Sequence, residues 1–235
     1  MNQIILITGA NRGIGLALTH IFLNQKDLVI ATCRHPESAS ALCDLQSTYP
    51  SKLKLFAIDV TDDKSISQVS QKISTDISHI DVLINNAGIS PAPFDASLET
   101  LRFQSVRDTF ETNVIGPMCV TRTLLSLLKK SSSPKVINIT SGLASLANKS
   151  NGLFYAYGIS KTALNMATRT MAIEFSKNKI IIVAIDPGWV QTDMGGPNAP
   201  LSSHESAEKI FNTIQSLSSD STGHFLYNDG TNLPW

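Results

Sequence analysis

A tyrosine and a lysine four residues apart, Tyr157 and Lys161, are suited to acid–base chemistry. At helical spacing the two side chains lie on one face, one turn apart, so the ammonium can sit beside the phenol. A free tyrosine has a pKa of about 10, and a neighbouring cation lowers that value because it favours the phenolate. The spacing therefore predicts a proton-transfer pair. On these two residues alone, a surface pair without chemistry remains an alternative.

A glycine-rich turn near the start of the chain predicts a nucleotide site. Gly9, Gly13 and Gly15 lie between an apolar run ending at Thr8 and a stretch of helical length. Glycines at such a turn allow a tight bend and a close approach of the backbone to a pyrophosphate. The helix N-terminus then offers unpaired N–H groups to the phosphates. The spacing, G-x-x-x-G-x-G, differs from the G-x-G-x-x-G of the dinucleotide fingerprint.

The residues after the second apolar run indicate which nicotinamide cofactor the chain prefers. An NAD site places a carboxylate there for the ribose 2′-hydroxyl, whereas an arginine accommodates a 2′-phosphate. This chain reads Ala-Thr-Cys-Arg-His over 31–35, with Arg34 and no acid, and Arg12 can supply a second cation. The pattern predicts NADP(H) in preference to NAD(H). The alternative is that Arg34 merely lies on a loop after a strand.

Short apolar runs rich in β-branched residues alternate with amphipathic stretches of helical length, a pattern typical of buried parallel strands joined by helices. The expected strands are Ile4–Ile7, Leu28–Ala31, Leu53–Ile58, Val82–Ile84, Lys135–Ile139, Ile180–Ile185 and His224–Tyr227. The expected helices are Gly13–Asn24, Pro36–Thr48, Lys64–Asp76, Leu101–Leu128, Tyr157–Lys177 and Ser206–Leu217. We expect right-handed crossovers and one doubly wound, Rossmann-type α/β sheet of about seven parallel strands with helices on both faces.

Local signals support these boundaries. Asp62 and Asp63 precede the third helix as candidate N-caps, and Asn178 is a candidate for the left-handed position after the Tyr157 helix. No linker, repeat or charge block divides the sequence. We therefore expect a single domain over residues 1–235.

Composition limits the classes of function. The chain has 235 residues, of which 42% are hydrophobic, and 19 basic residues balance 19 acidic ones. Such a balance argues against a nucleic-acid or anionic-membrane partner. Three widely spaced cysteines and five histidines form no metal-ligand pattern, so no metal is expected. The apolar runs are too short to span a bilayer, and no basic region with a cleavage site opens the chain. We expect a soluble, cytoplasmic protein.

Together, the glycine turn, Asn85-Asn86-Ala87-Gly88, Asn113, Ser141 and the Tyr157/Lys161 pair resemble the short-chain dehydrogenase/reductase family. The resemblance covers essentially the whole chain, with the motifs in the right order on the expected elements. The end of the chain, 227–235, and the long gap from Ser141 to Tyr157 are similar to the C-factor/sniffer-type carbonyl reductase branch.

The resemblance implies four catalytic residues. Tyr157 would protonate the carbonyl oxygen in reduction and act as the base in the reverse direction. Lys161 would lower the pKa of Tyr157 and hydrogen-bond the nicotinamide ribose. Ser141 would donate to the substrate oxygen. Asn113, in the helix beginning near Leu101, would hold a water that passes protons to Lys161.

The resemblance also implies cofactor-binding residues at the carboxyl ends of the strands, where ligands of open α/β folds bind. Asp59 and Val60 would meet the adenine, the stretch 86–88 would line the adenine ribose, and Thr192 would contact the nicotinamide carboxamide. The full set is Gly9, Asn11, Arg12, Gly13, Ile14, Gly15, Arg34, Asp59, Val60, Asn86, Ala87, Gly88, Tyr157, Lys161, Pro187, Gly188, Val190 and Thr192.

The expected activity is hydride transfer between a nicotinamide and the carbonyl or alcohol carbon of a small, mostly apolar substrate. The expected substrate pocket, without a basic cluster for a phosphate, is lined by Ile89, Ser90, Leu143, Phe154, Trp189 and Met194. One alternative is a regulatory or signalling NAD(P)-binding protein of C-factor type with little turnover. A dehydratase or epimerase that recycles its cofactor is another, although the C-terminal region leaves little room for a substrate domain.

The family also uses two long helices as its usual dimer face, here Leu101–Leu128 and Tyr157–Lys177, so a homodimer is possible. The stretch Leu146–Gly152 is an apparent insertion before Tyr157 that would reshape the substrate mouth and could weaken that face. A monomer therefore remains an alternative.

Overall fold

The computed structural model describes residues 3–91 and 97–235. Within this part of the chain, seven strands form one parallel sheet in the order β3-β2-β1-β4-β5-β6-β7. The strands are β1 (Ile4–Thr8), β2 (Leu28–Cys33), β3 (Leu53–Ala57), β4 (Val82–Asn85), β5 (Lys135–Ile139), β6 (Ile181–Asp186) and β7 (Phe225–Tyr227). The α-helices are α1 (Gly13–Asn24), α2 (Ser40–Thr48), α3 (Asp63–Asp76), α4 (Phe103–Phe110), α5 (Gly116–Leu128), α6 (Tyr155–Glu174) and α7 (Ser203–Ser216). This Rossmann-type α/β architecture confirms the predicted fold class.

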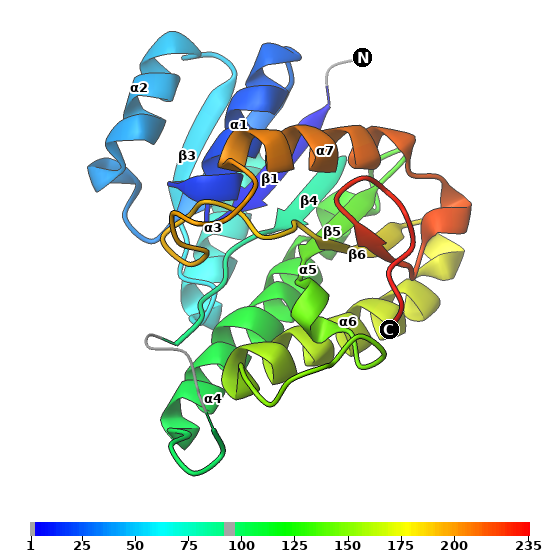
Figure 1. Cartoon of the computed structure of the whole chain (residues 1–235). Coiled ribbons are helices and arrows are strands. Elements are labelled where there is room, and N and C mark those ends of the chain that lie inside the picture. Colours follow the sequence, from blue (N-terminus) through cyan, green and yellow to red (C-terminus); the bar gives the residue numbers. More distant parts are fainter. Residues whose placement is uncertain (1–2, 92–96) are drawn as a thin grey trace.

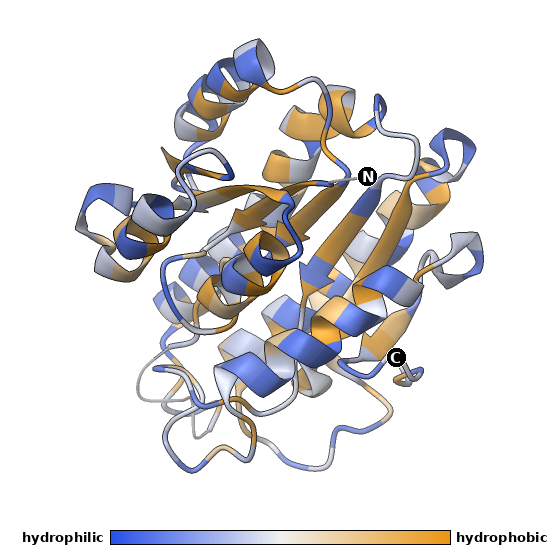
Figure 2. Ribbon diagram, turned by 90° about the horizontal axis from the view of Figure 1, so that it is seen from above, coloured by the Kyte–Doolittle hydropathy of each residue, from blue (hydrophilic) through white to orange (hydrophobic). Residues whose placement is uncertain are grey.

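Two hydrophobic cores lie on opposite faces of the sheet, because successive side chains of a strand point to opposite sides. On β1, Ile5 and Ile7 pack into the core formed with α1, α2 and α7. Leu6 instead packs into the core formed with α3, α5 and α6. Figure 1 shows the sheet between these two groups of helices. Figure 2 shows the hydrophobic strands at the centre and amphipathic helices around them.

The sheet reverses its strand order at β1, which pairs with β2 on one side and with β4 on the other. The crossover helices therefore leave on opposite faces, and the loops that follow β1 and β4 separate at the carboxyl edge. Ligands of doubly wound folds bind in the crevice formed at such a switch point. The glycine turn follows β1, and Asn86 follows β4, so both open into this crevice.

The expected helix over Leu101–Leu128 is not continuous. It consists of α4, a π-helical turn over Glu111–Ile115 and α5. A π-helical turn inserts one extra residue into the helical repeat, and such turns occur often at functional sites. It turns Asn113 into the protein interior, where the side chain is completely buried.

Of the two helix boundaries predicted from local signals, the one at Asp62 is confirmed and the one at Asn178 is wrong. Asp62 is the N-cap of α3 and accepts a hydrogen bond from the N–H of Lys64, as predicted. The left-handed residue after α6 is Lys179 (φ 56°) and not Asn178, which lies in a short 3₁₀ turn. The 3₁₀ turn extends the helical path by three residues and so moves the left-handed position one residue further along.

The segment after β7 folds back along that strand and covers the edge of the sheet. The N–H of Tyr227 donates to the carbonyl of Thr231 at 2.8 Å, and the N–H of Leu233 donates to the carbonyl of Phe225 at 2.8 Å. The carbonyl of Trp235 accepts a hydrogen bond from the N–H of Ala147 at 2.9 Å. The end of the chain therefore fastens the loop that follows Ser141, within the apparent insertion.

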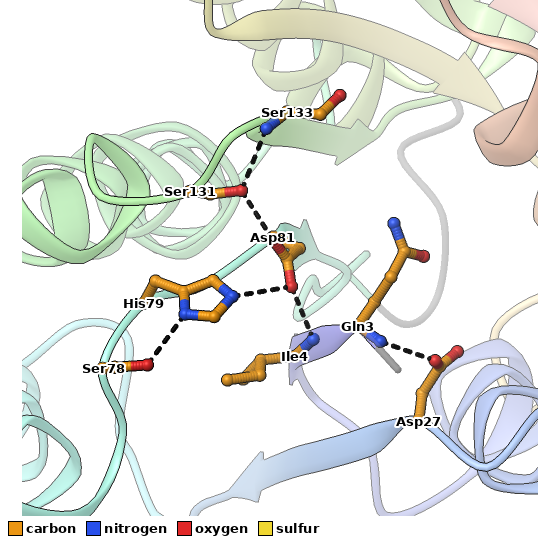
Figure 3. A network of polar contacts seen from close by, with 8 residues as sticks. All are labelled: Gln3, Ile4, Asp27, Ser78, His79, Asp81, Ser131 and Ser133. Atoms are coloured by element: carbon orange, nitrogen blue, oxygen red, sulfur yellow. Dashed lines mark hydrogen bonds and ion pairs between the residues drawn. The ribbon is translucent and has the colours of Figure 1, made fainter. Parts of the chain in front are cut away.

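A network of polar contacts joins the chain at the amino edge of the sheet, away from the crevice (Figure 3). Asp81 accepts hydrogen bonds from the N–H of Ile4 at 2.8 Å and from the hydroxyl of Ser131 at 2.5 Å. His79 lies 3.2 Å from the same carboxylate, and its other ring nitrogen contacts Ser78. These contacts tie the starts of β1 and β4 to the loop before β5.

None of the helices in the described part of the chain has the length and apolar character to cross a membrane.

Candidate active site

A cavity of about 1020 Å³ lies at the carboxyl edge of the sheet. It joins the glycine turn at one end to Tyr157 and Lys161 at the other. Its lining contains most of the residues named from the sequence: Gly9, Asn11, Arg12, Gly13, Ile14, Arg34, Asp59, Val60, Asn86, Ala87, Gly88, Ser141, Tyr157, Lys161, Pro187, Gly188, Val190 and Thr192. Gly15 and Asn113 do not line it and lie behind its wall.

The glycines of the turn are required by close packing and by backbone conformation. Gly9 and Gly13 have positive φ angles of 65° and 54°, which glycine adopts without steric cost. A Cβ on Gly15 would lie 2.4 Å from the carbonyl oxygen of Gly9 and 2.5 Å from Nδ2 of Asn86. The turn is therefore packed against the loop that follows β4, and α1 begins directly within it at Gly13.

Thr8, which the sequence analysis did not single out, connects the two loops. Its hydroxyl oxygen accepts hydrogen bonds from the N–H groups of Asn86 and Ala87, at 3.0 and 3.1 Å. In return, Nδ2 of Asn86 donates to the carbonyl oxygens of Thr8 and Gly9 at 2.9 and 3.0 Å. In this arrangement the amide of Asn86 braces the glycine turn. A threonine directly before the first glycine was the available signal.

At the end of the cavity beyond β2 and β3, the carboxylate of Asp59 faces Arg34, the arginine that is expected to bind the 2′-phosphate. Burial raises the pKa of Asp59, but hydrogen bonds from Thr61 and the charges of Arg34 and His35 outweigh it and hold the pKa below its usual value. The carboxylate accepts from the N–H and hydroxyl of Thr61 at 2.9 and 2.7 Å. Arg34 thus has an acidic neighbour and also an open path into the cavity.

Arg12 lines the cavity and contacts the loop after β6. Its guanidinium forms an ion pair with Asp193 from the loop after β6, and both side chains are exposed. That loop also meets the glycine turn through Thr192, whose methyl carbon would lie 3.1 Å from a Cβ on Gly13. The loop after β6 therefore closes over the start of α1.

Tyr157 and Lys161 lie on α6, beside Ser141. Ser141 is the second residue after the end of β5. The Nζ of Lys161 is 5.7 Å from the centroid of the Tyr157 ring and donates to the carbonyl of Ile139 at 2.9 Å. The side chain of Ser141 is a hydrogen-bond partner of Tyr157. The fold thus brings together three of the four residues expected to be catalytic at one end of the cavity.

The pKa of Tyr157 differs from the expectation. Burial raises it to about 12, the hydrogen bond with Ser141 lowers it in part, and the charge of Asp186 raises it further. Burial also lowers the pKa of Lys161 to about 8. Lys161 is not among the groups that set the pKa of Tyr157, so the expected lowering does not offset the burial of the phenol.

Asn113 is held by the backbone of Ile89. Its Oδ1 accepts from the N–H of Ile89 at 2.8 Å, and its Nδ2 donates to the carbonyl of Ile89 at 2.8 Å and to the hydroxyl of Ser160 at 3.0 Å. A Cβ on Gly88 would lie 3.2 Å from Oδ1 of Asn113 and 3.4 Å from Nζ of Lys161. Because position 88 is a glycine, the Asn113 amide and the Lys161 ammonium can both lie close to it. The π-helical turn places the Asn113 side chain behind the wall of the cavity.

Asp186, at the end of β6, is a buried acid to which the sequence analysis assigned no role. Its Oδ1 accepts from the N–H of Gly188 at 3.2 Å, and its carboxylate also accepts from the N–H of Gly142. Burial raises its pKa, and these two hydrogen bonds partly offset that effect. An acid on the last residue of an apolar strand, directly before Pro-Gly, was the signal that could have identified it.

The cavity lining contains all six residues expected to form the substrate pocket, of which all but Ser90 are apolar: Ile89, Ser90, Leu143, Phe154, Trp189 and Met194. Phe154 adopts a left-handed backbone conformation (φ 62°) immediately before α6. The indole N–H of Trp189 donates to the carbonyl of Gly195 at 2.8 Å. This hydrogen bond ties the Trp189 side chain to the loop that contains Gly195.

Comparisons with known proteins define the class of this one. The model of the short chain dehydrogenase family matches residues 3–201, and the chain belongs to that family. It is an NAD(P)-dependent short-chain dehydrogenase/reductase, as the motifs indicated.

Individual relatives place it near the carbonyl reductases of this family. The carbonyl reductase Sniffer of D. melanogaster superposes with a TM-score of 0.93 at 35% identity, over all of both chains. The NADPH-bound carbonyl reductase from chicken fatty liver superposes with a TM-score of 0.94 at 32% identity, over 100% of this chain and 99% of that one. C-signal of Myxococcus xanthus is 39% identical over 156 residues, which are 66% of this chain and 93% of that protein.

Proposed function

We propose that the protein is an NADP(H)-dependent carbonyl reductase that acts on a small, mostly apolar ketone, aldehyde or quinone. The observation that carries the proposal is the continuous cavity, which joins the glycine turn and Arg34 to Ser141, Tyr157 and Lys161. The apolar residues beside Tyr157 suit a hydrophobic carbonyl compound better than a sugar phosphate, because two of the three basic residues in the described lining, Arg12 and Arg34, are assigned to the cofactor.

The residues present fit a dinucleotide cofactor. The turn before α1 has no room for a Cβ at Gly9 or Gly15, and it presents the N-terminus of α1 to the cavity. No acidic residue occupies the first turn of α1, so no charge there repels a phosphate. Arg34 and Arg12 would hold the 2′-phosphate, which favours NADP(H) over NAD(H). When bound, the reduced nicotinamide supplies a hydride to the carbonyl carbon.

The protein's own residues would orient the substrate and supply the proton. Ser141 would donate a hydrogen bond to the substrate oxygen, and Tyr157 would give that oxygen its proton. Lys161 would hold the nicotinamide ribose and, with a water held by Asn113, return a proton to Tyr157. The absence of a side chain at Gly88 supports such a path, since a Cβ there would lie 3.2 Å from Oδ1 of Asn113 and 3.4 Å from Nζ of Lys161.

NADPH consumption against a panel of ketones, aldehydes, quinones and diketones, with NADH in parallel, tests the proposal. We expect turnover with NADPH for at least one apolar class and much weaker turnover with NADH. Tight binding of NADPH without turnover on any member of the panel would contradict the proposed reductase activity.

The similarity to C-signal favours a second candidate function, a regulatory NAD(P)-binding protein with little turnover. The two candidates differ in their need for Tyr157, because a protein that only binds the cofactor needs no proton donor. In cells that lack this gene, full complementation by Tyr157→Phe would favour the regulatory function. Loss of complementation would favour the reductase.

We further propose that residues 1–235 act as one cytoplasmic oxidoreductase domain and that the chain forms a homodimer through α5 and α6. Ile159, Met166 and Ile173 are exposed at intervals of seven residues along α6, which supports a helix–helix contact there. Light scattering after size-exclusion chromatography tests the dimer. A species of 25.4 kDa, the mass of one chain, at micromolar concentration would contradict it.

A further inference from the structure

Asn228, the first residue after β7, carries a buried amide that joins the ends of two strands. The residue is 9% exposed, and its Nδ2 donates to the carbonyl of Pro187, the first residue after β6, at 2.9 Å. The parallel register of the two strands pairs Asp186 with Tyr227, so the chain leaves both strands at the same level. Proline has no N–H with which to continue the backbone ladder. The side chain of Asn228 therefore connects the two loops where the ladder ends.

A second buried donor, from α7, reaches the same carbonyl. The hydroxyl of Ser206, which is completely buried, donates to the carbonyl of Pro187 at 2.7 Å. Thr213 lies seven residues further along α7, on the same face of the helix. Its hydroxyl donates to the carbonyl of Asn228 at 2.8 Å. A carbonyl oxygen has two lone pairs, so these donors fill the acceptor capacity of Pro187, and α7 also holds the backbone of Asn228.

The peptide group between Pro187 and Gly188 is fixed at both ends. Its carbonyl accepts from Asn228 and Ser206, and its N–H donates to Oδ1 of Asp186 at 3.2 Å. Neither Asn228 nor Ser206 lines the cavity, so the carbonyl points away from it. Gly188 has a positive φ of 80°, and a Cβ on it would lie 3.2 Å from Nδ2 of Asn228. The amide of Asn228 therefore packs directly against this turn.

This peptide group begins one wall of the cavity, because every residue of the stretch 187–195 lines the cavity. In the sheet, β6 lies beside β5, which leads to Ser141. The strand that leads to Arg34, β2, lies on the other side of β1 and β4. The wall formed by 187–195 therefore belongs to the end of the cavity that would hold the nicotinamide, and the 2′-phosphate would bind at the other end.

We propose that Asn228 is a positioning residue for the cofactor. Together with Ser206 it holds the carbonyl of Pro187 away from the cavity and so places the wall formed by 187–195 against the nicotinamide half of the bound dinucleotide. The proposal rests on the reductase function proposed above. A loop that is already fixed loses little conformational entropy when its ligand binds. Removal of either donor should therefore weaken the part of cofactor binding that this wall supplies.

The test compares the complete chain with Asn228→Ala and Ser206→Ala, each of which removes one donor to Pro187. Fluorescence titration measures the affinity for NADPH. Competition against NADPH measures the affinity for adenosine 2′,5′-bisphosphate, which carries only the 2′-phosphate end of the cofactor. Thr222→Val is the matched control, because the hydroxyl of Thr222 accepts from the N–H of Ile182 at 3.0 Å. That contact joins the chain before β7 to the start of β6, at the ends of the strands away from the cavity.

We expect Asn228→Ala and Ser206→Ala each to weaken NADPH binding about three- to tenfold, the factor that corresponds to one hydrogen bond of ordinary strength. Binding of adenosine 2′,5′-bisphosphate should stay within about twofold, because this ligand does not reach the wall formed by 187–195. Thr222→Val should change neither affinity. An equal loss of affinity for both ligands would overturn the proposal, because it would show a general loss of structure. Unchanged NADPH affinity in Asn228→Ala would overturn it as well.

The role of Asn228 and the reductase function can fail separately. If the unmodified chain binds NADPH but reduces no carbonyl compound, the reductase function fails and the affinities still decide the role of Asn228. If the unmodified chain does not bind NADPH, the role of Asn228 fails together with the proposed cofactor. If Asn228→Ala does not fold, Asn228→Asp takes its place, because it keeps the shape of the side chain and replaces the donor Nδ2 by an oxygen. The same selective loss of NADPH affinity is then expected, and its absence would overturn the proposal.

Discussion

Lys161 is a buried cation, and its ionisation links the chemistry of the site to the stability of the fold. Burial lowers its pKa to about 8, although the ammonium keeps one hydrogen bond to the carbonyl of Ile139. Below about pH 8 the lysine is charged in both the folded and the unfolded chain, so the full penalty of burying the charge opposes folding. As pH rises from there towards the ordinary lysine value of about 10.4, the folded chain releases the proton first. Its stability then increases.

We therefore expect Lys161→Met to stabilise the protein while it abolishes turnover. At neutral pH the free energy of unfolding should rise by about 1–3 kcal/mol, because the penalty disappears and one hydrogen bond is lost. Urea unfolding at several pH values measures the effect. The gain should shrink as pH rises above about 8. A variant less stable than the unmodified chain at neutral pH would contradict this account.

Arg34 is the residue that we propose sets the cofactor preference. We expect Arg34→Asp to lower the ratio of NADPH to NADH efficiency by at least about tenfold, because a second carboxylate beside Asp59 would repel the 2′-phosphate and accept from a ribose hydroxyl. Steady-state kinetics with both cofactors measure the ratio. An unchanged ratio would mean that Arg34 lies on its loop without contacting the cofactor.

At the scale of the elements, the turn before α1 is built for glycine. We expect Gly15→Ala to weaken NADPH binding by at least about tenfold, because its Cβ would meet the carbonyl of Gly9 at 2.4 Å and displace the turn. Gly152→Ala is the matched control, since a Cβ there would have no atom within 4 Å. Fluorescence titration with NADPH measures both. Equal affinities for the two variants would argue against a phosphate site at this turn.

The polar network at the amino edge has a structural role that can be separated from the site. Asp81→Ala should lower the free energy of unfolding by about 2–4 kcal/mol, because the N–H of Ile4 and the hydroxyl of Ser131 lose their acceptor. Thermal or urea unfolding measures the loss. The kcat of the folded fraction should remain unchanged, since Asp81 directly precedes β4 at the amino edge of the sheet and does not line the cavity. A selective loss of kcat would contradict this separation.

The strands and most helices could be predicted from the sequence, because buried parallel strands leave continuous apolar runs. The π-helical turn around Asn113 could not, since a single i→i+5 insertion barely changes the spacing of apolar residues over the expected helix. The position after α6 was misplaced by one residue, at Asn178 rather than Lys179, because a short 3₁₀ turn carries no distinct sequence signal.

The candidate site was predictable as a set of residues, but its electrostatics were not. Motif order placed Ser141, Tyr157 and Lys161 at one sheet edge, and the cavity contains all three. The direction of the Tyr157 pKa depends on how deeply packing buries the phenol and on the buried charge of Asp186, which comes from a different strand. Neither quantity follows from the spacing of two residues on one helix.

At the scale of the whole molecule, the reversal of strand order at β1 creates the crevice, and the loops after β1, β4, β5 and β6 all contribute to one cavity. The end of the chain takes part as well, since Trp235 fastens the loop that follows Ser141. We therefore propose that cofactor binding and proton transfer share one continuous site, in which Tyr157 transfers the proton.

The most direct measurement compares kcat/KM and NADPH affinity for Tyr157→Phe and Tyr155→Phe, using the best carbonyl substrate of the panel. Both tyrosines lie in the first turn of α6, and both changes remove one hydroxyl. We expect Tyr157→Phe to lose at least about 100-fold in kcat/KM with nearly unchanged NADPH affinity, because general-acid catalysis contributes about that much. Tyr155→Phe should stay within about twofold of the unmodified chain. Comparable turnover by the two variants would contradict the proposed role of Tyr157 and, with it, the proposed mechanism.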